Sequence, residues 1–524
     1  MKMSAKKIRE IPKTFFLFLI PVLVLLYTPL AMASFTLDDE KKLGKEFYDK
    51  LEKNELLLHD DKAAAYLNKL GKLILSHSDK LPFDYRFSII RSAGINAFAT
   101  PGGYIYVNQG LINLAENEGE LAGVLAHEIA HVNGRHVAEM IDRSKKLNIS
   151  TLAAIIAGAF LGGGGDLTAA VTSFSVAAAT SLSLQYSREH EEAADRGGLS
   201  YLDAAGYNGK YMLDFLRVMR RYEYYSSTIP SYFFTHPGTE ERIGYIDALL
   251  QTTYKKGGAE QIIGGLKRIQ TILRLQGEDS SANLKFFKEE IASDKNNLDA
   301  LYGLAVTEGK IGMANEAVEH FQRALALNGK DPDILRDFGI SLFKLGKFPE
   351  AAPYLRRAIV VSHDDATANL YLGKTLLATG NVAEAIDLLK ELEKKHPADP
   401  DVCYDLAVAY GKASEKGLSH YYFGRYFRMK EKKESALFHF QAALKELPAN
   451  EEKAEEIRKE IDSLKSPAHS KQPPISLNHP ATSFFAAKGL STNNLDRIAL
   501  RFGLDLVAAI EQNRKRSNAT LRIL

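Results

Sequence analysis

The sequence predicts an α+β domain, mostly helical with a small sheet, followed by an all-α solenoid of repeated helix pairs and a small C-terminal domain. A chain of 524 residues is too long for one hydrophobic core. Residues 34–255 mix helical periodicity with one strand-like segment, YIYV, after a Pro-Gly-Gly turn. Within residues 256–465, small and large apolar residues recur at a fixed period. The stretch SPAHSKQPPISLNHP, residues 466–480, then forms a linker to residues 481–524.

The first 33 residues have the pattern of a removable signal peptide. The basic segment Lys2–Lys13 precedes the apolar run FFLFLIPVLVLLYTPL, and Ala31 and Ala33 fit the small-residue cleavage pattern. We expect cleavage between Ala33 and Ser34 and export of the mature chain; an uncleaved membrane anchor is the alternative. The prefix holds five basic residues and one acid, so removing its +4 from the total of +2 leaves −2. This charge offers no basic field for nucleic acid. The single cysteine, Cys403, cannot form an internal disulfide and does not indicate a compartment.

The segment LAGVLAHEIAHVNGRH places titratable side chains in an otherwise apolar helix. His127 and His131 are about 40° apart around a helix, on one face, where two imidazoles can hold one Zn²⁺. Glu128 lies about 100° away, where its carboxylate can take a proton from a water molecule beside the metal. Two structural histidines are the alternative. His136 is about 140° off this face, and we expect a structural role for it.

A zinc site that catalyses hydrolysis needs a third protein ligand and an open position. The segment QYSREHEEAADRGGLSYL offers that ligand, because Glu191 and Asp195 are one helical turn apart. Glu191 can bind the metal while Asp195 accepts the spare N–H of a ligating histidine. A solvated charged helix face is the alternative, and we expect Glu189 and Glu192 to face solvent.

HExxH, followed by ExxAD and then by THP with an arginine six residues after its histidine, resembles the membrane-linked gluzincin family, which includes the CAAX-prenyl-protein proteases. Some bacterial members join such a domain to tetratricopeptide repeats behind a signal peptide. The resemblance implies a zincin-like metallopeptidase domain with one Zn²⁺ per chain. The residues it implies are the metal ligands His127, His131 and Glu191, the general base Glu128, Asp195 behind a ligand, and the late active-site pair His236 and Arg242.

The resemblance also implies a substrate-binding strand in NAFATPGGYIYVNQGLI. The family uses this segment as an edge strand beside the metal, so Gly103, Tyr104, Ile105 and Tyr106 would contact a peptide through their main chain. An ordinary hairpin is an alternative that does not exclude this role. Asn96 is a further candidate for a polar group near the site.

Between the two metal-binding segments, residues 149–184 are small and apolar and are interrupted by Gly162–Gly165. Each half is short for a transmembrane span. We expect two buried helices that cover the cleft, with the glycines as a hinge. Peripheral contact with a membrane surface is the alternative.

Residues from about 280 to 448 repeat with a period of 34. Small residues let paired helices approach, glycines break the helix between them, and larger apolar residues fill the gap. The period and the residues resemble tetratricopeptide repeats; a plain helical bundle is the alternative. The register slips after Ala407 and restarts at Gly424, and Phe287 suggests a degenerate first repeat. The series are Ala305, Gly339, Gly373 and Ala407; Ala317, Ala351 and Ala385; Gly312, Gly346 and Gly380; and Phe321, Leu355 and Leu389.

The C-terminal segment NNLDRIALRFGLDLVAAIEQN resembles the core of a LysM peptidoglycan-binding module, although the usual opening strand of that module is not evident. A capping helical hairpin is the alternative and is the one we favour.

Together these features predict an exported zinc metalloendopeptidase with a repeat scaffold. The resemblance points to the periplasm, to outer-membrane protein assembly and to quality control. It implies unfolded or misassembled envelope proteins as substrates and the outer-membrane assembly machinery as a partner of the repeats. Two other functions remain open: a chaperone or adaptor acting mainly through its repeats, and a cell-wall-associated peptidase directed by its tail.

Overall fold

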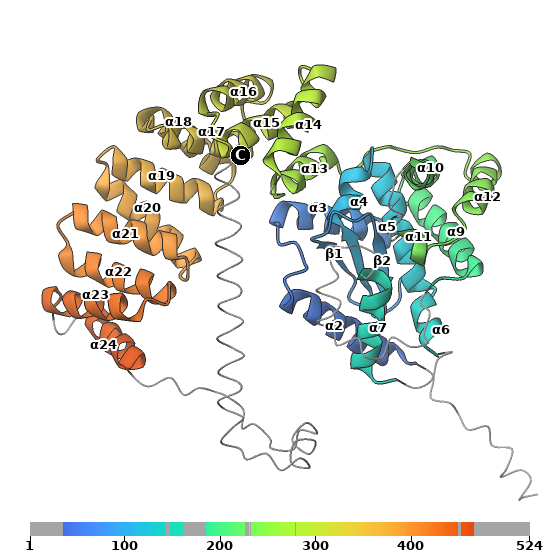
Figure 1. Ribbon diagram of the computed structural model, residues 1–524, viewed down its shortest axis with the longest axis horizontal. Helices are drawn as coiled ribbons and strands as arrows, with labels where there is room; N and C mark the ends of the chain where they lie inside the picture. The colour runs from blue at the N-terminus through green and yellow to red at the C-terminus, as the bar shows by residue number, and fades with distance from the viewer. Residues whose placement is uncertain are drawn as a thin grey trace, which may run out of the picture. The chain divides into compact units, whose positions relative to one another are not determined.

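The computed structural model describes residues 35–142, 147–161, 185–225, 230, 232–277, 279–448 and 452–465 (Figure 1). It confirms the predicted order of a mostly helical α+β domain with a small sheet and an all-α array of repeats. The predicted signal peptide, the Gly162–Gly165 hinge, the linker at 466–480 and the module at 481–524 lie outside the described residues.

The N-terminal part contains strands and helices in mixed order. Its elements are α2 (Leu37–Lys53), α3 (Asp61–Leu75), β1 (Arg86–Ile90), β2 (Ala97–Thr100), β3 (Tyr104–Asn108), α4 (Gln109–Leu114), α5 (Glu118–Asn133), α6 (His136–Asp142), α7 (Ile149–Leu161), α9 (Arg188–Ala204), α10 (Lys210–Tyr225), α11 (Tyr232–Thr235) and α12 (Thr239–Thr252).

The described strands form a three-stranded sheet in the order β1-β3-β2. β3 pairs in parallel with β1 and antiparallel with β2, so its backbone is engaged on both sides. The predicted edge strand at Gly103–Tyr106 is therefore wrong, because β3 is central. Its neighbours, RFSII and AFAT, are only five and four residues long, too short for a clear strand pattern in the sequence.

Helix α5 carries the HExxH segment. Asn117 caps its N-terminus by accepting a hydrogen bond from the Glu120 N–H, and the helix ends at Gly134. Every residue from Glu118 to Val132 is buried, so α5 packs against neighbours on all sides, unlike a surface helix. These neighbours include α3, α9, α10 and β2.

Helix α9 lies against α5 because a glycine stands at the contact. A Cβ built on Gly198 would lie 3.0 Å from the backbone N of His127 and 2.8 Å from Met212 Cε. At its start, Ser187 and His190 form a capping box. The close approach brings the acids of α9 within reach of the histidines of α5.

Helix α7 is the first half of the apolar segment and is a buried helix, as predicted. It packs against α2, and the Phe160 ring stacks on Phe98 with centroids 4.9 Å apart. Over the described ranges, no helix is both long and apolar enough to cross a membrane.

A buried carboxylate connects the N-terminal domain to the first helix after it. Glu118, 2% exposed, accepts hydrogen bonds from the backbone N–H groups of residues 262–264 and from the phenols of Tyr66 and Tyr207. The segment leads into α13 (Leu266–Leu275), whose Ile269 and Leu273 belong to the same hydrophobic core as α5. Packing thus continues past residue 255, where we predicted the domain boundary.

The next seven helices each pack against the helix beside them along the chain. They are α14 (Ser280–Ser293), α15 (Leu298–Lys310), α16 (Ala314–Leu327), α17 (Pro332–Lys344), α18 (Phe348–Val361), α19 (Ala366–Ala378) and α20 (Val382–Lys395). A Cβ on Gly339 or Gly373 would lie 2.7 or 2.8 Å from the side chain of Leu355 or Leu389. The 34-residue series therefore marks the contacts within each helix pair.

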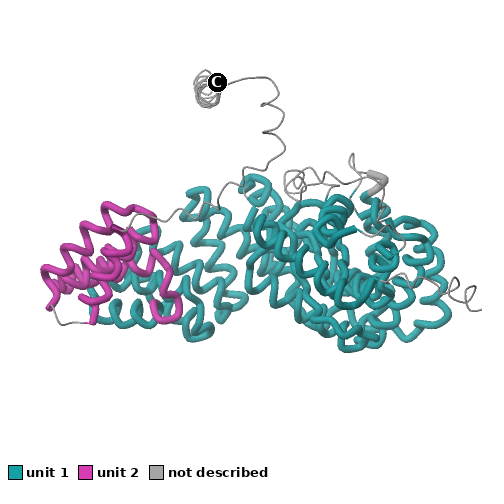
Figure 2. Tube along the Cα trace, turned by 90° about the horizontal axis from the view of Figure 1, so that it is seen from below, with its two compact units in different colours: residues 1–392 teal, residues 393–524 magenta. Residues whose placement is uncertain are grey.

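The chain divides into two compact units, residues 1–392 and 393–524 (Figure 2). The described helices of the second unit are α21 (Pro400–Lys412), α22 (Lys416–Met429), α23 (Lys433–Glu446) and α24 (Glu452–Lys465). Gly424 of α22 faces the Phe440 ring of α23, where the repeat pattern restarts. Cys403 is buried with a free thiol.

Candidate metal centre

Four side chains from three segments converge in the N-terminal domain. His127 and His131 come from α5, Glu191 from α9, and His236 from the turn after α11. One ligand atom from each can be chosen so that all four lie within 4.8 Å of one another. The most exposed of the four, His127, is only 2% exposed.

The contacts within this cluster suit a cation. His127 Nε2 and His131 Nε2 lie 2.9 Å apart. Glu191 places one oxygen 3.6 Å from His127 Nε2 and the other 3.4 Å from His131 Nε2. Burial, with His127 nearby, lowers the pKa of His131 well below its ordinary value, so its imidazole is neutral and can donate a lone pair. Two imidazoles and a carboxylate are a donor set that metal ions such as zinc accept.

Unpartnered atoms around the cluster support the same assignment. Both carboxylate oxygens of Glu128 and the Nε2 atom of His236 are buried without a hydrogen-bond partner among the described residues. Leaving such atoms unpaired is costly unless a ligand or water engages them. The residues present therefore fit a metal ion with a reactant beside it.

Asp195 lies behind His127. Its Oδ1 is 2.8 Å from His127 Nδ1, so the ring proton sits there and Nε2 points into the cluster. Arg242 binds the same carboxylate through two hydrogen bonds of 2.8 Å, and the Tyr245 hydroxyl donates to it as well. Although burial opposes ionisation, Arg242 and His127 lower the pKa of Asp195, which stays charged.

Arg242 faces carboxylates on both sides. Its Nη1 lies 2.6 Å from Glu191 Oε2, besides the paired bonds to Asp195. Despite its burial, the two carboxylates raise the pKa of Arg242 well above its ordinary value. In this arrangement Arg242 is a positioning residue that holds Glu191 and Asp195.

His236 enters the cluster from a tight turn. The following Gly238 has φ 82°, a left-handed conformation that glycine adopts readily. His236 Nδ1 lies 3.0 Å from Glu191 Oε1 and 3.3 Å from His127 Nε2, and Nε2 lies 3.6 Å from Glu128 Oε1. Burial opposes its charge, but Glu191 and Glu128 raise the pKa of His236. The imidazole thus occupies space beside the ligand atoms.

The sequence pattern did not predict the contacts that several supporting residues make with the ligand cluster. His136 Nδ1 lies 2.8 Å from His131 Nδ1, so His136, predicted to be structural, orients a ligand. The Tyr186 ring stacks on His131 at 3.9 Å, and the Tyr232 ring stacks on His236 at 4.4 Å. Tyr186 lies five residues before Glu191, but its spacing alone does not reveal the ring contact.

The predicted substrate residues lie elsewhere than expected. Gly103, Tyr104, Ile105 and Tyr106 belong to the central strand or its start, whereas β2 lies at the side of the sheet and packs against α5. The Asn96 side chain does not point at the metal ligands; its Nδ2 donates to the Phe160 carbonyl at 2.9 Å.

We expect His127→Ala, His131→Ala or Glu191→Gln each to lower the metal content of the purified protein, because each removes one of three ligands. Elemental analysis by mass spectrometry measures this. The control is Glu192→Gln on α9, whose side chain is 48% exposed and bonded to Arg196, and which should retain metal. Equal metal in His127→Ala and the control would contradict the ligand set.

Comparisons with known proteins match the N-terminal domain and the repeats separately. Residues 62–250 match Peptidase family M48, and residues 336–400 match a tetratricopeptide repeat. A relative from Vibrio cholerae is 30% identical over 282 residues, which are 53% of this chain and 57% of that protein.

Two further relatives carry informative names. The beta-barrel assembly-enhancing protease of Escherichia coli strain K12 is 28% identical over 214 residues, 41% of this chain and 44% of the relative. Mitochondrial metalloendopeptidase OMA1 of Schizosaccharomyces pombe is 28% identical over 218 residues, 41% of this chain and 62% of the relative. The chain spans about half the length of the bacterial relatives it matches. These matches confirm the resemblance inferred from the motifs: the chain contains a Peptidase family M48 domain followed by tetratricopeptide repeats.

Proposed function

We propose that this chain is an exported zinc-dependent endopeptidase that works in the periplasm. The observation that carries this proposal is the buried His127–His131–Glu191 cluster beside the unpartnered carboxylate of Glu128. Bacterial relatives are named beta-barrel assembly-enhancing protease, which supports a role in the assembly of β-barrel proteins of the outer membrane. We extend the proposal to quality control of misfolded envelope proteins on the family resemblance of the motifs alone. The direct test is casein hydrolysis by the purified protein, with Glu191→Gln as the variant that should lose both metal and activity.

The residues of the cluster would divide the work of hydrolysis. Zinc held by His127, His131 and Glu191 would supply Lewis acidity that polarises the scissile carbonyl and makes water more acidic. Glu128 would take the proton of the attacking water and pass it to the leaving amine. Burial raises the pKa of Glu128, which suits a group that must first accept and then donate a proton.

The substrate would bind beside β2 rather than beside β3. Among the described strands β2 has one partner, so its other side is where a peptide can add by main-chain hydrogen bonds. Helix α7 covers this region through Phe160, which stacks on Phe98 and binds Asn96. Peptide addition would require α7 to move away from β2.

His236 would hold the enzyme latent by occupying the open side of the metal. Its imidazole stands within the ligand cluster and contacts Glu191. If it blocks the site, His236→Ala should raise basal casein cleavage, because the fourth position becomes free. If it instead stabilises the developing oxyanion, the same change should lower kcat by about ten- to a thousandfold.

The measurement is basal casein cleavage by His236→Ala at equal metal content. His190→Ala is a useful comparison, because this histidine stacks on His136 and bonds Glu139 outside the ligand cluster. A fall in activity rejects the blocking role, and unchanged activity rejects both roles.

The repeats would bind substrates or partners. A pocket of about 280 Å³ lies among α15, α16, α17 and α19. Val306, Phe321 and Ile340 supply apolar walls, and Lys310 and Lys344 supply charge. Such a pocket can hold a peptide segment by burial of an apolar side chain, with the lysines selecting acidic neighbours.

Variants of this pocket distinguish a peptidase from a chaperone or adaptor. We expect Ile340→Arg to leave casein cleavage within about twofold, since half-buried Ile340 lies on α17, outside the domain that holds the metal cluster. It should impair growth under outer-membrane stress in a deletion strain complemented by the variant. Full complementation by Glu128→Gln, together with loss in Ile340→Arg, would favour a chaperone or adaptor. Pulldown on purified peptidoglycan with and without residues 481–524 tests the third possibility, a cell-wall peptidase.

A further inference from the structure

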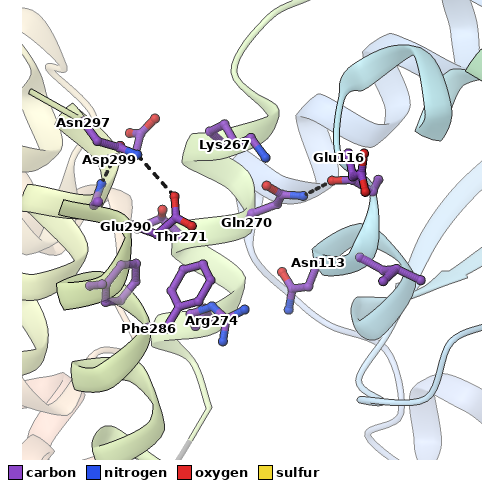
Figure 3. Close-up of a pocket in the computed structure, with 14 residues that line it drawn as sticks. Asn113, Glu116, Lys267, Gln270, Thr271, Arg274, Phe286, Glu290, Asn297 and Asp299 are labelled. Carbon is purple, nitrogen blue, oxygen red and sulfur yellow. Dashed lines mark hydrogen bonds between the residues drawn. The ribbon is translucent and has the colours of Figure 1, made fainter. Parts of the chain in front are cut away.

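A second polar pocket lies between the peptidase domain and the first helices that follow it (Figure 3). Its volume is about 180 Å³, enough for one or two amino-acid residues. One wall is the end of α4 and the residues after it, another is α13, and a third comes from α14 and the start of α15. Pockets at domain junctions are preferred places for ligands.

Helix α13 turns one polar face into this pocket. Lys267, Gln270, Thr271 and Arg274 all line it, and their spacing of three, four and seven places them on one side of the helix. Gln270 is already engaged, since its amide donates to the carbonyls of Ile112 and Ala115. Figure 3 shows these side chains between Asn113 and Glu116 on one side and Phe286 and Asn297 on the other.

Arg274 is poised to bind an anion. Its guanidinium carbon lies 3.7 Å from the centroid of the Phe286 ring, so the plane is held by stacking. Burial lowers the pKa of Arg274, only partly offset by Glu290, yet the group remains charged at neutral pH. No ion pair joins Arg274 to any residue in the described ranges at salt-bridge distance.

The acidic residues that line the pocket form ion pairs or hydrogen bonds with described neighbours. Asp299 pairs with Arg268 at 2.5 Å, and Glu116 pairs with Arg221 at 3.0 Å. Glu290 accepts a hydrogen bond from Asn297. By contrast, Lys267 makes no ion pair or hydrogen bond with another described side chain. Among the described side chains of the pocket, the charges without an ion pair are those of Lys267 and Arg274, both positive, and that of Glu290, so the balance of unpaired charge is positive by one.

An unpartnered acceptor indicates which anion fits. Asn113 lines the pocket, and its Oδ1 atom is buried without a hydrogen-bond partner among the described residues. Chloride or sulfate has no hydrogen-bond donor to satisfy it, whereas a peptide supplies both a carboxylate and an amide N–H. Leu114, Ala115 and Phe286 offer apolar surface for a side chain.

We propose that this pocket binds the C-terminal carboxylate of a polypeptide. Arg274 takes the carboxylate through its N–H edge, and Asn113 Oδ1 accepts the last peptide N–H. The terminal side chain lies against Leu114 and Phe286. Lys267, two helical turns from Arg274, attracts the anion at the mouth of the pocket. A role of this pocket in delivering chain ends to the peptidase rests on the proposed function. The binding of a C-terminal carboxylate does not.

The test measures binding in the full chain carrying Glu128→Gln, so that no peptide is cleaved. The probe is fluorescein-labelled Gly-Ser-Gly-Ser-Ala-Leu, with either a free C-terminal carboxylate or an amide, followed by fluorescence anisotropy. We expect the free acid to bind at least about tenfold more tightly than the amide, since hydrogen bonds to charged groups are the stronger ones. Arg274→Gln should abolish this difference, and added salt should weaken it.

Two further variants serve as a second test of the pocket and as a control. Asn113→Asp leaves Arg274 in place but adds a negative charge in the pocket, and should also weaken binding of the free acid. Lys288→Gln, at an exposed position of α14 outside the pocket, should change nothing. Equal binding of acid and amide, a difference that persists in Arg274→Gln, or no binding of either peptide below about 1 mM would overturn the proposal. Because no turnover is measured, failure of the peptidase proposal leaves these outcomes unaffected.

Discussion

Glu128→Gln should abolish peptide hydrolysis while leaving the metal in place. The amide cannot take a proton from water, and general-base contributions are typically about a hundred- to ten-thousandfold. Glu128 is one residue beyond His127 on α5 and is not among the clustered ligand atoms, so its replacement should not disturb binding. Casein cleavage and metal content, measured on the same preparation, check both halves of the expectation.

Glutamine has nearly the same size and shape as glutamate, so Glu128→Gln should also preserve the packing. Glu128 is fully buried with both oxygens unpartnered, so glutamine fits the same space without breaking a described hydrogen bond. Glu192→Gln, the solvent-facing control on α9, should keep activity and metal. Metal loss in Glu128→Gln equal to that in His127→Ala would overturn the separation of base from ligands.

Glu118→Leu should lower the free energy of unfolding by about 3–5 kcal/mol. The change leaves the two buried phenols of Tyr66 and Tyr207 without their acceptor, and the part-buried backbone N–H groups of residues 262–264 lose theirs as well. Each unmet buried group costs about 1–3 kcal/mol before relaxation, and the part-buried N–H groups cost less because water can reach them. The free energy comes from urea denaturation of the full chain, followed by circular dichroism. Because α13 follows the bound segment, the loss should appear in the transition of the N-terminal domain.

Glu116→Gln is the control for this prediction. Glu116 lies two residues away and is exposed, and the ion pair it forms among the described residues is with Arg221; such surface pairs contribute about 0–1 kcal/mol. Glu118→Gln should fall between control and leucine variant, because its amide oxygen can still accept some of the bonds. If Glu118→Leu lowers the free energy of unfolding by less than about 1 kcal/mol, water replaces the carboxylate. In that case the carboxylate does not join α5 to residues 262–264.

Local spacing was enough to predict the parts of the site that lie on one helix. His127 and His131 share a face because an α-helix brings residues four apart together, and Glu191 and Asp195 do so for the same reason. The 34-residue series predicted which glycines meet which leucines, as Gly339 with Leu355 shows. In each case the partners are near in sequence, so periodicity carries the information.

The sheet was predicted less well. β3 was recognised from its β-branched and aromatic residues, but its place in the sheet depends on pairing with β1 and β2. Those strands are short, and β2 is buried at every position, so neither shows a clear alternation of apolar and polar residues. Edge or central position is a property of the neighbours and not of the strand itself.

The sequence by itself determined the HExxH helix, the acidic helix behind it and the repeat array, because each is specified by residues within one or two helical turns or by a regular period. Only the tertiary structure decided that His236 reaches His127 across 109 positions, that Tyr186 and Tyr232 stack on the histidines, and that Glu118 holds the segment before α13. These contacts join segments that are far apart in the chain. Their geometry depends on how whole helices pack, which no local pattern of residues encodes.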